Sequence, residues 1–182
     1  GIALTTQGIW ATVVYRLRRW AGYECRPRFL RKLLAPFGVL LGLMMDIIAG
    51  IHIEPEIDIG PGLYIGHFGG IILGGRTTIG KFANISHGVT IGYAGRGGSW
   101  GLPVIGDFVY IAPGAKLIDR IRVGNHVAIG ANAVVTKDLP DDAVAVGVPA
   151  RVISQHSSRD FVQFNRERSR AVLDDESPAA LS

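Results

Sequence analysis

The chain has 182 residues, of which 48% are hydrophobic and 19% charged, so it can bury a core and is not a disordered chain. Its length predicts one domain with a small appended element. The net charge of +4 does not by itself indicate nucleic-acid binding, and the single cysteine, Cys25, excludes an intrachain disulfide framework and fits a reducing compartment.

The first fifty residues are predicted to form helices. Apolar residues from Ile9 to Trp20 recur at helical spacing, and a second helical stretch runs from Pro27 through Ala49. These helices are expected to cap the domain or to pack between subunits. Because basic residues and tryptophans occur together here, the alternative is an amphipathic segment that rests on an anionic membrane surface.

The N-terminal half contains no segment that we expect to cross a membrane. The longest apolar run, residues 36–53, is interrupted by Asp46 and His52. No basic segment precedes an apolar stretch near the N-terminus, so we expect no signal peptide. The sequence therefore predicts a cytoplasmic protein, with peripheral contact at the inner face of the membrane as the alternative.

Beyond the helices, aliphatic residues recur every six positions, and glycine often follows them. A period of six is neither helical nor a plain hairpin pattern, and it predicts short strands joined by turns, three to a triangular coil of about 18 residues. Inward side chains then stack at the strand spacing of about 4.8 Å. We expect a mainly β fold, a parallel β-helix over 51–153, between a helical segment 1–50 and a C-terminal helix and tail 154–182. The repeated positions are Ile53, Ile59, Ile65, Ile71, Ile79, Ile85, Ile91, Ile105, Ile111, Leu117, Val123, Ile129 and Val135.

Two interruptions of the repeat predict local departures. Ile71 and Ile79 are two residues too far apart, which predicts an enlarged corner between them. Ile91 and Ile105 are about eight residues too far apart, which predicts a protruding Gly-rich loop over residues 93–102. A long loop on a rigid scaffold is a usual place for function. After the repeat ends, residues 161–173 are predicted to form a short closing helix.

Histidine is the natural base for activating a hydroxyl near neutral pH. His67 follows an inward isoleucine and should lie at a corner. The phase of the repeat predicts that His87 stacks above it, with Pro113 and Ala131 at the same position in later coils. His126 and His156 are expected to be surface residues.

Five segments carry a family resemblance: IGHFGGIILGG, ISHGVTIG, IGDFVYIAPGAKLI, IGANAVVTKDLP and AVGVPARVI. Over residues 53–153 they resemble the bacterial serine acetyltransferases and their exopolysaccharide-associated relatives. The last two segments are also similar to galactoside-type acetyltransferases. The resemblance implies a left-handed β-helix, a homotrimer or dimer of trimers, and acetyl-CoA bound in a groove at a subunit edge.

The resemblance also implies roles for particular residues. His67 corresponds to the family's general base, and His87 is a second catalytic candidate. A backbone N–H at Gly92 is the candidate oxyanion donor. No metal is expected. The residues implied in acetyl-CoA binding are Ala112, Ala131, Thr136, Lys137 and Arg151. The small alanine side chains suit a narrow groove for the pantetheine arm, and the two cations suit the phosphates of CoA.

Three departures from the family concern the acceptor. His52 stands where the family has an aspartate that partners the base, Gly66 replaces the aspartate before the base, and Leu102 replaces a second histidine. A free amino acid needs charged partners. We therefore expect O-acetylation of a sugar or polysaccharide precursor, with serine O-acetylation in cysteine biosynthesis as the alternative.

Two other functional classes are alternatives. A γ-type carbonic anhydrase on the same fold needs three zinc-binding histidines, two of them closely spaced in one segment, and no such pair exists. A non-catalytic scaffold or membrane-docking module is distinguished by failure to bind CoA.

Overall fold

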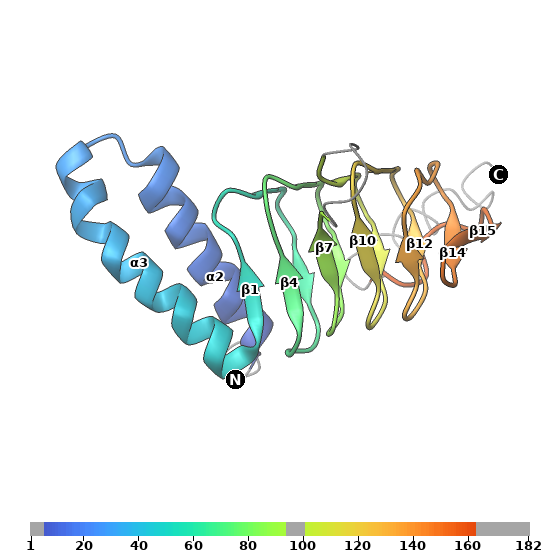
Figure 1. Cartoon of the computed structure of the whole chain (residues 1–182), viewed down its shortest axis with the longest axis horizontal. Coiled ribbons are helices and arrows are strands. Elements are labelled where there is room, and N and C mark those ends of the chain that lie inside the picture. Colours follow the sequence, from blue (N-terminus) through green and yellow to red (C-terminus); the bar gives the residue numbers. More distant parts are fainter. Residues whose placement is uncertain (1–5, 94–100, 163–182) are drawn as a thin grey trace, which may run out of the picture.

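The computed structural model describes residues 6–93 and 101–162. A helical hairpin lies at one end of an elongated β-helix, and the last strands lie at the other end (Figure 1). The hairpin consists of helix α2 (Gln7–Arg19), a π-helical turn η1 (Trp20–Glu24) and helix α3 (Arg28–Ala49). Both predicted helices are confirmed, whereas the π-helical turn was not predicted.

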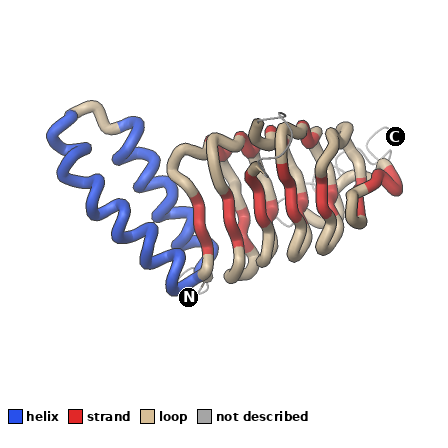
Figure 2. Tube along the Cα trace, in the orientation of Figure 1, coloured by secondary structure: helices blue, strands red, loops and turns tan. Residues whose placement is uncertain are grey.

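The rest of the described chain is a left-handed parallel β-helix with three sheets, as predicted. Figure 2 shows its short strands stacked along the long axis. Sheet A contains β1 (Ile51–Ile53), β4 (Ile71–Leu73), β7 (Thr90–Gly92), β10 (Lys116–Ile118) and β13 (Val134–Val135). Sheet B contains β2 (Asp58–Ile59), β5 (Thr78–Ile79), β8 (Val104–Ile105) and β11 (Arg122–Val123). Sheet C contains β3 (Tyr64–Ile65), β6 (Asn84–Ile85), β9 (Tyr110–Ile111), β12 (Ala128–Ile129), β14 (Val144–Val146) and the antiparallel β15 (Arg151–Ser154).

The core is a set of stacked aliphatic columns. In sheet C, Ile85 pairs with Ile65 on one side and with Ile111 on the other, and its side chain is completely buried. Small or branched residues lie four positions after the inward aliphatic residues. Two of them, Val109 and Ala133, are also completely buried. The six-residue repeat is therefore the spacing between successive inward positions around one coil.

The structure corrects the position of the two extra residues. In β4 both Ile71 and Leu73 point inward, and it is Leu73 that pairs with Ile91 of the next coil. The spacing from Leu73 to Ile79 is then regular, and the two extra residues lie between Ile65 and Leu73. The enlarged corner is thus the one that carries His67.

The corners that follow the histidine positions are tight turns. Gly88 and Gly114 have positive φ angles of 71° and 76°, and Asn132 occupies the same place with φ 55°. A Cβ atom on Gly88 would lie 3.3 Å from the Cα of Gly114, a tight contact, and the positive φ angle at this position favours glycine. This turn fixes the direction in which His87 leaves the backbone.

Helix α2 is anchored to the first coil by side chains that bind its carbonyl groups. The buried Tyr15 hydroxyl donates to the Ile57 carbonyl at 2.7 Å, and burial raises the pKa of Tyr15 above its ordinary value. Arg16 donates to the carbonyls of Ile59 and Gly60 at 2.7 and 2.6 Å. These bonds satisfy backbone acceptors that the first coil, having no preceding coil, would otherwise leave unpaired.

Two sequence expectations lie largely outside the described residues. Most of the Gly-rich loop over 93–102 falls there, including Arg96 and Trp100. Most of the predicted closing helix over 161–173 also lies outside the described residues. Phe161 is described and lies in a turn, where its N–H donates to the Ser158 carbonyl at 2.8 Å.

Candidate active site

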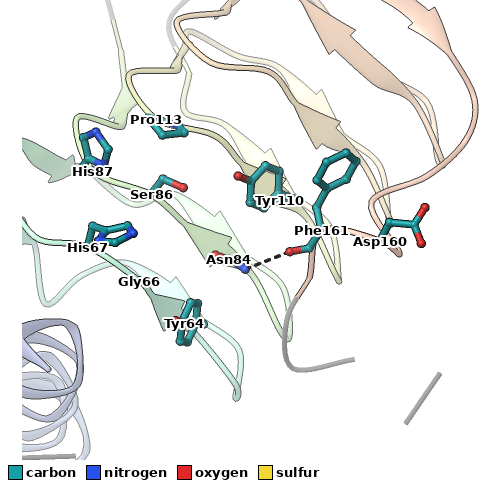
Figure 3. A pocket seen from close by; sticks show the side chains of 10 residues that line it. All are labelled: Tyr64, Gly66, His67, Asn84, Ser86, His87, Tyr110, Pro113, Asp160 and Phe161. Atoms are coloured by element: carbon teal, nitrogen blue, oxygen red, sulfur yellow. Dashed lines mark hydrogen bonds between the residues drawn. The ribbon is translucent and has the colours of Figure 1, made fainter. Parts of the chain in front are cut away.

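The corner between sheets C and A carries two imidazoles. His67 follows β3 and His87 follows β6, one coil later, because Ile65 and Ile85 are paired. Their ring centroids are 5.9 Å apart with an interplanar angle of 83°, an edge-to-face arrangement. Both side chains are exposed, and Figure 3 shows Pro113 beyond them on the same edge. The structure therefore brings together the two histidines that the repeat placed on one corner.

A cavity of about 370 Å³ opens beside these rings. Its floor is the outer surface of sheet C, formed by Tyr64, Asn84 and Tyr110. Phe161 closes one side: its ring stacks on Tyr110 with centroids 5.2 Å apart, and its carbonyl accepts a hydrogen bond from Asn84 at 3.4 Å (Figure 3). The cavity is lined by Tyr64, Gly66, His67, Asn84, Ser86, His87, Tyr110, Pro113, Asp160 and Phe161.

A second hollow, of about 270 Å³, is also lined by His67. It is formed by the start of α2, from Thr6 to Gly8, and by the enlarged corner at Gly66 to Phe68. His67 therefore lines both hollows. His87 lines only the larger one.

The polar partners of these histidines differ from the family pattern. Among residues 6–93 and 101–162, no carboxylate is hydrogen-bonded to His67. His52 instead pairs with Asp46 of α3, with His52 Nδ1 and Asp46 Oδ2 3.0 Å apart. Leu102 lies against Gly75, at the corner between sheets A and B, and not beside His67.

Lys116 supports the turn after His87. Its ammonium donates to the Gly88 carbonyl at 2.6 Å and to the Thr90 hydroxyl at 2.9 Å. Lys116 is the register partner of Thr90 on the next coil, and sequence reasoning did not identify this contact.

The residues implied in acetyl-CoA binding are spread over several edges. Ala131 occupies the same position of the repeat as His87 and Pro113, and it is exposed. Ala112, directly before Pro113, is buried. Thr136 and Lys137 are exposed and follow β13, at the corner between sheets A and B. Arg151 begins β15 and donates to the Ala150 carbonyl at 3.0 Å. One chain does not gather these residues beside His67.

Gly92 ends β7, and β7 separates it from His87. It pairs with Ile118, and its carbonyl accepts from the Asp119 N–H at 3.1 Å. In a parallel ladder this register directs the Gly92 N–H toward the neighbouring strand. To serve as an oxyanion donor, Gly92 would have to leave that ladder, so the role stays a prediction.

The remaining histidines lie elsewhere. The His126 ring stacks on Phe108, with centroids 4.9 Å apart, at the corner between sheets B and C. His156 is exposed. The described residues contain no group of three or more His, Cys, Asp or Glu side chains that could hold a metal ion.

Comparison with known proteins gives consistent results. The family model for the bacterial transferase hexapeptide (six repeats) matches residues 103–137. The chain is 38% identical to a serine acetyltransferase of Helicobacter pylori (strain J99), and the match covers 85% of each chain. It belongs to the serine acetyltransferase-like family of hexapeptide-repeat acyltransferases.

Other members of the family are longer than the matched region. A serine acetyltransferase of Mycobacterium tuberculosis is 38% identical over 81% of this chain and 61% of its own length. A solved structure of a serine acetyltransferase in complex with CoA superposes with a TM-score of 0.69 at 30% identity, covering 82% of this chain and 58% of that one. The chain thus spans about three fifths of these relatives. None of the three is described as exopolysaccharide-associated, and that finer assignment stays a prediction.

Proposed function

We propose that this protein transfers an acetyl group from acetyl-CoA to an acceptor hydroxyl, at the corner that carries His67 and His87. The observation that supports this best is the pair of imidazoles, 5.9 Å apart, that share a cavity of about 370 Å³. One corner of the β-helix holds both rings, and a nitrogen base beside a space that admits an alcohol is what acyl transfer to a hydroxyl requires.

The proposed reaction is a direct transfer. His67 takes the proton of the acceptor hydroxyl as the oxygen forms a bond to the thioester carbonyl carbon. The tetrahedral intermediate then collapses, the carbon–sulfur bond breaks, and the CoA thiolate leaves with the proton returned from the imidazolium. His87 lies close enough to orient the acceptor or the His67 ring. Hydrogen-bond donors directed at the developing oxyanion stabilise the intermediate.

The donor site is proposed to be completed between chains. The exposed cation Lys137 and its neighbour Thr136 lie at a different corner from His67, so they are suited to meet the His67 corner of an adjacent copy. A homotrimer, predicted from the family resemblance, would supply this arrangement three times. In it, Lys137 and Arg151 would bind the phosphates of CoA, and Ala131 would leave room for the pantetheine arm.

L-Serine is the proposed acceptor. The relatives reported above are all named serine acetyltransferases, and they favour this alternative over the sugar or polysaccharide acceptor that we expected first. One observation supports a sugar as the acceptor. Gly66 and Leu102 provide no charge at positions where the family pattern has charged or basic groups. A neutral polyhydroxyl acceptor would not need those groups.

The two acceptors are distinguished by measuring thiol release from acetyl-CoA by the full chain. L-Serine is compared with nucleotide sugars and free sugars, each with a blank that lacks acceptor. We expect saturable thiol release with L-serine and only the blank rate with sugars. Turnover with a sugar alone would contradict serine as the acceptor. No turnover with any acceptor, together with no CoA binding by calorimetry, would contradict the acetyltransferase function.

A further inference from the structure

The outer face of the helical hairpin is apolar and uncovered. Helix α3 is long and apolar enough to cross a membrane, and it is the one such helix among the described residues. Unlike the core helix of a soluble domain, most of it is exposed: Phe29 is 76% and Ile47 75% accessible. One helical face carries this surface from end to end, through Phe29, Leu33, Leu40, Leu43, Met44 and Ile47.

The apolar surface continues onto helix α2. Ile9, Trp10, Val13 and Leu17 are all exposed on one side of α2. An apolar groove joins the two helices, lined on one side by Leu17 and Trp20 and on the other by Leu34, Phe37 and Leu41. The hairpin therefore presents one continuous apolar surface, larger than the scattered exposed side chains that are normal for a soluble protein.

The basic residues of the hairpin fall into two groups. Those of α2 are engaged by the β-helix: Arg16 binds two carbonyls of the first coil, and Arg19 pairs with Asp58 at 3.0 Å. Those near the free end of the hairpin are exposed, and within the described part of the chain they pair with no carboxylate. This second group, the tip cluster, consists of Arg26, Arg28, Arg31 and Lys32.

We propose that the hairpin lies flat on an anionic membrane, with its apolar surface in the acyl boundary and the tip cluster among the lipid phosphates. Apolar surface flanked by lysine, arginine and tryptophan is the pattern of a helix that rests in the interface. A spanning orientation fits less well. Between Lys32 and Asp46 the uninterrupted apolar stretch is about 20 Å long, against a hydrocarbon core of about 30 Å.

A second copy of the chain is a poorer partner for this surface. The only carboxylates on the hairpin are Glu24, 3.9 Å from Arg19, and Asp46, which is paired with His52. Packing hairpin on hairpin would therefore bury apolar area but offer the four cations of each tip cluster only Glu24 and the paired Asp46 as partners. An anionic lipid surface complements both features.

The test is cosedimentation of the full chain with vesicles. Phosphatidylcholine vesicles are compared with vesicles that contain about 30% phosphatidylglycerol. We expect binding to the anionic vesicles, weakened by raising the salt from about 0.15 M to about 0.5 M. The charge variant Arg28→Gln/Arg31→Gln/Lys32→Gln should bind about a hundredfold more weakly, at about fivefold for each cation. The apolar variant Leu40→Glu/Ile47→Glu should bind at least about tenfold more weakly.

Two matched controls separate the hairpin from the rest of the surface. Arg76→Gln/Lys81→Gln/Arg122→Gln removes the same net charge from exposed positions on the β-helix, and Ile72→Glu/Val104→Glu adds the same two carboxylates at exposed apolar positions of β4 and β8. Both should bind like the unaltered chain. Equal binding by all variants, or no binding to anionic vesicles, would overturn the proposal. So would light scattering in which Leu40→Glu/Ile47→Glu breaks up an assembly that does not bind lipid, because a second copy would then cover this face.

Discussion

Replacing His67 with alanine is expected to lower kcat for acetyl transfer by at least about two orders of magnitude while the fold remains intact. General base catalysis contributes roughly 10²–10⁴-fold, and His67 is the imidazole that lines both hollows of the corner. Its side chain is exposed, so its removal leaves no cavity in the core. The measurement is steady-state thiol release with saturating acetyl-CoA and acceptor, with circular dichroism as the check on folding.

His156→Ala is the matched control, since this histidine is exposed and does not line the cavity. It should retain the unaltered kcat. His87→Ala measures the contribution of the second ring and should lower kcat by a smaller factor if His87 only orients. A His67→Ala protein that turns over at a near-normal rate would remove His67 from the mechanism.

Replacing Ile85 with alanine is expected to lower the free energy of unfolding by about 2–5 kcal/mol. Its side chain is completely buried and stacks between Ile65 and Ile111, in the column directly before the histidine corner. Strands of two or three residues supply few contacts of their own, so the stacked column carries much of the packing between coils. Ile85→Val should cost only about 0.5–1.5 kcal/mol. Urea unfolding followed by circular dichroism measures both.

The control for this prediction is Ile72→Ala. Ile72 lies in β4 on the outer face of sheet A and is 49% exposed, so its truncation should change the unfolding free energy by no more than about 0.5 kcal/mol. If Ile85→Ala were as mild as Ile72→Ala, the stacked columns would not be the source of stability. The two variants remove the same atoms and differ only in burial.

The fold could be predicted from the sequence because each coil repeats the same pattern of short strands, turns and inward aliphatic residues. Inward aliphatic residues six apart leave little freedom in how the chain can bury them. The pairings of Leu73 with Ile91 and of Ile79 with Ile105 locate the larger insertion between Ile91 and Ile105, where most of the predicted loop lies outside the described residues. The smaller insertion was misplaced. Ile71 and Leu73 are both buried in β4, so either could stand as the repeated position, and only the pairing of Leu73 with Ile91 decides between them.

The site residues that could be predicted from the sequence are those whose positions follow from the six-residue repeat. The register that pairs Ile65 with Ile85 also brings His67 and His87 together. Tyr64, Asn84 and Tyr110 obey it too, each lying one position before an inward isoleucine, and a search of outward positions would have found them. Phe161 could not be found this way. It reaches Tyr110 from beyond the repeat, by a contact between residues far apart in sequence.

The most direct test of the proposed site is a structure of the full chain with CoA bound. We expect the CoA thiol beside the corner that carries His67 and His87, with the pantetheine arm passing Ala131 and the phosphates near Lys137 and Arg151. If these residues come from two chains, the trimeric arrangement is supported as well. A thiol at any other corner of the β-helix would contradict the assignment of the active site.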